Sequence, residues 1–126
     1  MIAVATSQVG YHEGPGNDTI YGAWYGLPGA PWCAMYQTWV AAHAGCAGFI
    51  PRFAWTPGGA QWFRDHDRFG HVPQPGALGF LYGAAAGRIH HVFLVTALLP
   101  AGYMATVEGN TSLTGSATGD GVYRLR

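Results

Sequence analysis

Charge is scarce in this chain of 126 residues. Only a tenth of the residues are charged, all six basic residues are arginines, and six acidic residues balance them. A protein whose main partner is DNA or RNA normally carries a clustered positive face that releases counterions from the phosphates. The arginines form no such cluster in the sequence. We therefore expect no nucleic-acid partner, and a ligand that is uncharged or mixed in charge.

Long apolar runs are also missing. No segment approaches the roughly 20 apolar residues that span a bilayer, so we expect no membrane insertion. The apolar residues 1–5 follow no basic region, and a polar turn at residues 10–13 interrupts them, so no signal peptide is predicted. The chain is then either a protein without an export signal of its own or a domain cut from a larger one.

Cysteine is limited to Cys33 and Cys46, whose spacing matches no zinc-binding motif and implies no disulfide. Cys46 lies among small apolar residues, as buried structural cysteines often do. Twenty glycines and eight prolines indicate many turns, and the length suits a single domain over residues 1–126. We expect that domain to be a monomer.

Three helices are predicted in the first half, over residues 2–9, 31–44 and 59–68. The middle one has the clearest pattern, because its apolar residues recur at helical spacing and predict an amphipathic helix with one buried face. Those residues are Trp32, Met35, Tyr36, Trp39 and Val40. Pro31 suits the first turn and Gly45 a stop. Loops are predicted at residues 14–18 and, rich in aromatic residues, at 21–26.

The second half consists of short apolar or alternating runs, bounded by glycine, proline or asparagine, that predict strands. They cover residues 79–82, 89–98, 103–108 and 121–125. Helices followed by strands indicate an α+β fold in which the N-terminal helices pack on an antiparallel β-sheet.

Cys33 stands out because it lies in the first turn of the predicted central helix, where free N–H groups and the helix dipole favour a thiolate. A thiolate nucleophile needs a base, and residues 89–95 place His90 and His91 on opposite faces of a strand. Glu108 and Asn110, two residues apart, point to one side if the strand continues that far. Either one is suited to orient an imidazole.

Three motifs carry a resemblance to the papain-like CHAP family, the cysteine- and histidine-dependent amidohydrolases and peptidases. They are Gly-Ala-Pro-Trp-Cys-Ala-Met-Tyr at residues 29–36, His-Val-Phe-Leu-Val at 91–95 and Glu-Gly-Asn-Thr at 108–111. The segments 5–11 and 17–26 also resemble the family's phage lysins. The resemblance implies Cys33 as nucleophile, His91 rather than His90 as base, and Glu108 or Asn110 as the orienting group.

The same resemblance implies a peptidoglycan hydrolase that cleaves either the N-acetylmuramoyl-L-alanine amide or a bond of the stem or cross-bridge. No cofactor is required, although some members bind calcium before the nucleophile. The oxygen ligands in that region are Glu13, Asn17 and Asp18. Without a signal peptide, we expect a phage lysin that leaves the host cytoplasm through holin pores to reach the cell wall, or a domain of a larger wall-active protein.

Two alternatives remain open at this point. A metal-dependent wall hydrolase would use histidines as ligands, although the chain lacks an HExxH motif. The available histidines are His12, His66, His71, His90 and His91. A non-catalytic cell-wall binding module would suit the aromatic, weakly charged composition.

Overall fold

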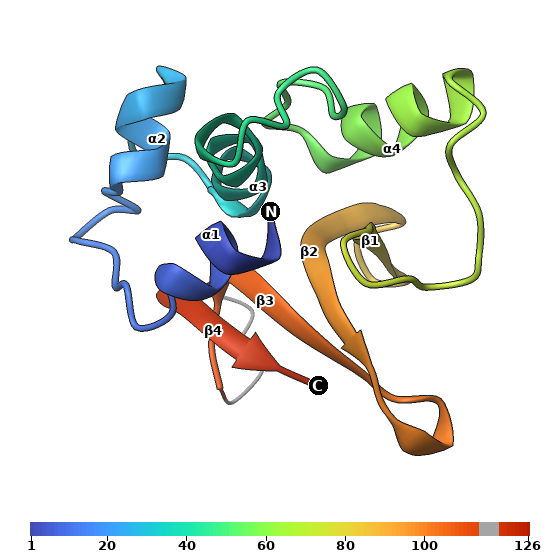
Figure 1. Ribbon diagram of the computed structural model, residues 1–126. Coiled ribbons are helices and arrows are strands. Elements are labelled where there is room, and N and C mark those ends of the chain that lie inside the picture. The colour runs from blue at the N-terminus through green and yellow to red at the C-terminus, as the bar shows by residue number, and fades with distance from the viewer. Residues whose placement is uncertain (114–118) are drawn as a thin grey trace.

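A computed structural model describes residues 1–113 and 119–126 as helices followed by strands (Figure 1). The helices are α1 (Ile2–Ser7), α2 (Ile20–Tyr25), α3 (Cys33–His43) and α4 (Thr56–Asp65). The strands are β1 (Leu78–Gly83), β2 (Arg88–Leu98), β3 (Met104–Thr111) and β4 (Gly121–Leu125), with a short 3-10 turn, η1 (Pro100–Gly102), before β3. The four strands form one antiparallel sheet in the order β1-β2-β3-β4, which confirms the predicted α+β class.

The two central strands pair over only part of their length. Pairing between β2 and β3 runs from Leu98–Met104 to Leu94–Val107 and ends there. Beyond that point residues 88–93 of β2 pair with β1, and residues 108–111 of β3 run beside β4. We call this divergence the fork. In Figure 1 its two arms open towards α3, which contacts both strands.

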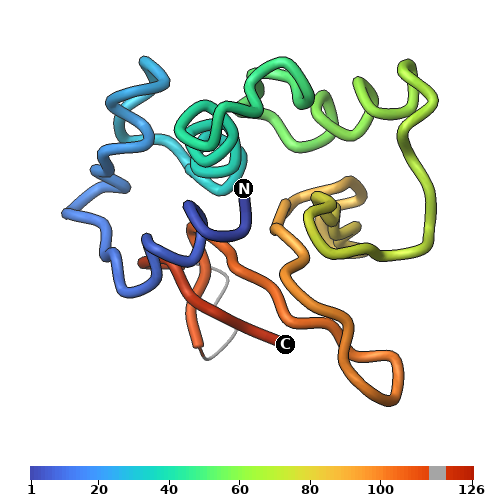
Figure 2. Tube along the Cα trace, in the orientation of Figure 1, coloured from blue at the N-terminus to red at the C-terminus, as the bar shows by residue number. Residues whose placement is uncertain are grey.

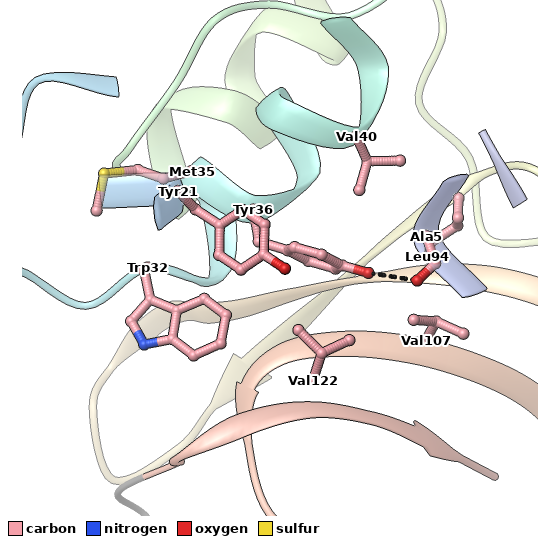
Figure 3. Close-up of a cluster of buried hydrophobic side chains, with 9 residues drawn as sticks. All are labelled: Ala5, Tyr21, Trp32, Met35, Tyr36, Val40, Leu94, Val107 and Val122. Carbon is pink, nitrogen blue, oxygen red and sulfur yellow. Dashed lines mark hydrogen bonds between the residues drawn. The ribbon is translucent and has the colours of Figure 1, made fainter. Parts of the chain in front are cut away.

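Helix α3 forms the centre of the core. Its buried residues are Cys33, Ala34, Met35, Tyr36, Gln37, Thr38, Val40 and Ala41, which lie all around the helix. The prediction of one buried face was therefore wrong. Helices α1 and α2 cover one side of α3 while β2 and β3 cover another, so both sides exclude water. Figure 3 shows this packing, with the Tyr36 hydroxyl donating a hydrogen bond to the carbonyl oxygen of Ala5.

The predicted aromatic loop at residues 21–26 was also wrong, because residues 20–25 form α2. Thr19 caps this helix, since its Oγ1 accepts a hydrogen bond from the Gly22 N–H. Gly26 ends it in the left-handed conformation, with φ of 98°, which glycine adopts without strain. Two local capping residues thus make a helix out of a short aromatic segment.

The remaining boundaries differ from prediction by a few residues at most. Helix α4 begins three residues early because Pro57 fits its first turn. Helix α3 begins after Pro31, with Trp32 as its N-cap, and Gly45 follows its end with φ of 72°. The chain between α4 and β1 runs as a long arc beside the sheet (Figure 2). No helix in the described part of the chain is long and apolar enough to cross a membrane.

Candidate active site

Cys33 is the first residue of α3, as the sequence predicts for a nucleophile at a helix start. Its side chain is 7 % exposed and packs with Ala34, Phe53 and Val92. Trp32, the N-cap residue, supplies no side-chain hydrogen bond to the first turn. Cys33 therefore lies at the positive end of the helix dipole without a competing side-chain cap.

The residue before the nucleophile is held firmly in the core. Trp32 is fully buried, and its ring stacks on Tyr21 with the centroids 5.4 Å apart. Its indole Nε1 donates a hydrogen bond of 2.6 Å to Oε2 of Glu13. Gly109 lies against the same ring, since a Cβ there would come within 2.8 Å of Trp32 and Tyr36. These contacts fix the start of α3 and with it the position of Cys33.

His91 and Glu108 lie on the two arms of the fork. His91 Nε2 and Glu108 Oε2 are 2.8 Å apart, and the two side chains are only 15 % and 13 % exposed. His90, the neighbouring histidine, is exposed and packs over Gly83 at the far end of the strand pair. The structure thus brings His91, rather than His90, to Glu108.

The pKa of His91 reflects its surroundings. Burial alone would lower this pKa, because it disfavours the charged ring. The interactions of the ring with Cys33 and with Glu108, through hydrogen bonding and charge, outweigh burial and raise the pKa from 6.5 to about 9. The imidazolium is therefore favoured at neutral pH, and Cys33, His91 and Glu108 form one coupled group.

Asn110 takes a different place from Glu108. The register between β3 and β4 shifts between Glu108 and Thr111, and Asn110 has φ of 56°, in the left-handed region that asparagine tolerates. The regular alternation that would put both side chains on one side is therefore interrupted after Glu108. The carboxylate that accepts the hydrogen bond from His91 Nε2 is that of Glu108.

Thr106 is a contact of the site that the sequence analysis missed. Its side chain lies two residues before Glu108 on β3, and its Oγ1 donates a hydrogen bond of 2.5 Å to Glu108 Oε1. Thr106 is 5 % exposed. The two-residue alternation of a strand, applied backwards from Glu108, is the signal that indicates this neighbour.

The residues proposed for calcium lie in the loop before α2. Gly14 and Asp18 form an isolated bridge there, and Asn17 has φ of 60°. Glu13 is engaged by Trp32, which gives this carboxylate a structural role. Within residues 1–113 and 119–126, no three histidine, cysteine, aspartate or glutamate side chains gather as metal ligands. The calcium site stays a prediction.

Two cavities open near the site without being lined by Cys33, His91 or Glu108. One of about 1370 Å³ lies between the start of the chain, the arc after α4 and β1. The other, of about 690 Å³, lies beside Trp55 at the start of α4 and reaches Ile89, two residues from His91. Ile89 and Phe93, which line these cavities, each lie two residues from His91 on β2.

Comparison with known proteins agrees with this geometry. The family model of the CHAP domain matches residues 24–110, well over half of the chain, and the match includes Cys33, His91, Glu108 and Asn110. Glu13, Asn17 and Asp18 lie outside the matched range. No curated protein and no solved structure matches the chain significantly. The chain belongs to the CHAP domain family, whose general function is that of an amidase-type peptidoglycan hydrolase.

Proposed function

We propose that this chain hydrolyses an amide bond of peptidoglycan with Cys33 as the nucleophile, His91 as acid and base, and Glu108 as the group that orients His91. The observation that carries the proposal is the 2.8 Å contact between His91 Nε2 and Glu108 Oε2, beside a cysteine at a helix start. The three side chains come from α3, β2 and β3, and their types suit a nucleophile, a base and an orienting group.

The two ring nitrogens of His91 take separate roles. Nε2 is held by Glu108, so Nδ1 is the nitrogen that exchanges a proton with the sulfur and the leaving group. The thiolate attacks the carbonyl carbon, and the Nδ1 proton passes to the departing amine as the C–N bond breaks. Water, deprotonated by the now neutral ring, then attacks the thioester and releases the acid together with Cys33.

The oxyanion that forms during attack needs hydrogen-bond donors. The first turn of α3 supplies them, because its backbone N–H groups lie around Cys33 and Trp32 contributes no side-chain cap. The negative charge then forms at the positive end of the same eleven-residue helix that carries the nucleophile.

Replacing the nucleophile tests this mechanism. The Cys33→Ala and Cys33→Ser variants should release no soluble fragments from purified cell walls while keeping the circular dichroism spectrum of the unaltered protein. The Cys46→Ser variant is the matched control, because Cys46 is the other free cysteine and lies after α3, and it should remain active. Fragment release by Cys33→Ala would reject the thiolate mechanism.

Two further measurements separate the rival functions. A metal-dependent hydrolase would lose activity in a chelator, whereas the proposed enzyme loses it with a thiol-alkylating reagent and keeps it in the chelator. A wall-binding module would sediment with purified walls without releasing new amino termini.

Titration calorimetry with calcium tests the proposed ligands Glu13, Asn17 and Asp18, and the absence of heat would remove that site.

The proposed hydrolase could be one of two enzyme types, which differ in the peptidoglycan bond that they cleave. An amidase separates the stem peptide from the sugar, and an endopeptidase cuts within the stem or the cross-bridge. Mass spectrometry of digested peptidoglycan distinguishes free stem peptides from shortened ones. Recovery of free stem peptides would favour the amidase form.

A further inference from the structure

The carboxylate of Glu108 is held at both of its oxygens. Oε2 meets His91 Nε2 at 2.8 Å, and Oε1 accepts the hydrogen bond of 2.5 Å from the Thr106 hydroxyl. A glutamate side chain has three rotatable bonds, so a contact at one oxygen alone leaves the carboxylate free to swing. The second contact fixes the plane in which Oε2 faces the imidazole.

Thr106 itself is placed rigidly. Its backbone lies in the middle of the sheet, opposite Val95 on β2 and Leu125 on β4. A β-branched side chain has few χ1 rotamers, and burial at 5 % exposure restricts them further. The hydroxyl therefore has a fixed position next to the point where β2 and β3 separate.

We propose that Thr106 is a positioning residue of the active site, acting on His91 through the carboxylate of Glu108. The inference rests on the proposed function, because it assigns Thr106 a part in the same proton transfer. A hydroxyl that donates to a carboxylate stabilises its charge and its orientation, and both keep the imidazolium of His91 paired. Thr106 touches neither the sulfur nor the substrate in this arrangement.

The test uses three variants of the full chain. Thr106→Val keeps the β-branched shape and removes the hydroxyl, whereas Thr106→Ser keeps the hydroxyl. Thr96→Val is the matched control, because the Thr96 hydroxyl on β2 donates to the backbone carbonyl of Ala105, 3.1 Å away, and not to the site. Loss of the hydrogen bond in Thr106→Val should lower kcat about tenfold and leave KM unchanged. Thr106→Ser and Thr96→Val should keep kcat close to that of the unaltered protein.

A second readout does not need turnover. NMR titration of the His91 ring, assigned by comparison with the His91→Gln variant, should give a lower pKa in Thr106→Val and an unchanged pKa in Thr96→Val. An unchanged His91 pKa together with an unchanged kcat in Thr106→Val would overturn the proposal. An equal loss of kcat in Thr96→Val would also overturn it, because the effect would then be general destabilisation. If the unaltered protein fails to cleave walls, the proposed function fails, while the titration still decides whether Thr106 acts on His91.

Discussion

Replacement of Glu108 by glutamine separates the effect of the negative charge next to His91 from the effect of side-chain shape. The Glu108→Gln variant keeps an oxygen and a similar volume next to His91 but removes the negative charge. Loss of a neighbouring opposite charge lowers a histidine pKa by about one to three units. The pKa of His91, about 9 in the folded chain, should therefore move towards its ordinary value of 6.5.

This shift has a consequence for stability. A pKa of about 9 in the folded chain, against 6.5, is a difference of 2.5 units. At about 1.4 kcal/mol per pKa unit it corresponds to about 3–4 kcal/mol of unfolding free energy. Because the folded chain binds the proton more tightly, this contribution is fully present below pH 6.5 and is lost as the pH rises to about 9. The free energy of unfolding of the unaltered protein should fall across that window.

Urea unfolding between pH 6 and pH 9.5 measures the effect, with the midpoint and slope fitted at each pH. The free energy of unfolding should fall less steeply with pH in Glu108→Gln than in the unaltered protein. Titrating groups outside the coupled Cys33, His91 and Glu108 are the same in both chains, so their contributions cancel in the difference. Parallel pH profiles in the two proteins would refute the view that Glu108 raises the pKa of His91.

Two further substitutions test the packing around the site, and a third tests the choice of His91 as the base. Gly109→Ala should destabilise the fold by about 1–3 kcal/mol, because its Cβ would lie 2.8 Å from the rings of Trp32 and Tyr36; an unchanged melting temperature would contradict this packing. Tyr36→Phe removes one of two donors to the Ala5 carbonyl, which also accepts from the Gln8 N–H, and should cost about 0.5–1.5 kcal/mol in urea unfolding, whereas no loss would mean that the hydroxyl contributes no net stability. His90→Gln should keep kcat, since this exposed ring lies away from Glu108, and a strong loss would transfer the role of base to it.

The elements that local sequence patterns determine were predictable. The strand at residues 121–125 matches β4 at both ends, and the alternating run at 89–98 differs from β2 by one residue. Alternation and flanking glycines are local signals, so they need no knowledge of the rest of the chain. Helix α2 was missed although its signals are also local. The aromatic residues were interpreted as a loop, and Thr19 and Gly26 were not recognised as its capping residues.

The site was predictable in its residue types and less so in its geometry. A cysteine at a helix start and a histidine on a strand follow from position in the sequence, whereas the choice between Glu108 and Asn110 depends on where the register of β3 shifts. A register shift is set by the partner strand β4 and by the space next to α3. The hydrogen bond from Thr106 likewise depends on the side-chain conformation of Glu108, which no sequence pattern encodes.

The fork explains how two strands of one sheet can hold His91 and Glu108 beside a helix. Pairing between β2 and β3 stops at Leu94 and Val107, and α3 contacts both strands. Gln37, fully buried one turn after Cys33, donates from Nε2 to the carbonyl oxygen of Val107 at 3.4 Å, at the base of the fork. The helix thus contributes a polar contact where strand pairing stops. His91 and Glu108 both lie beyond this last pair, so they meet each other and Cys33 where the two strands have separated and α3 contacts both.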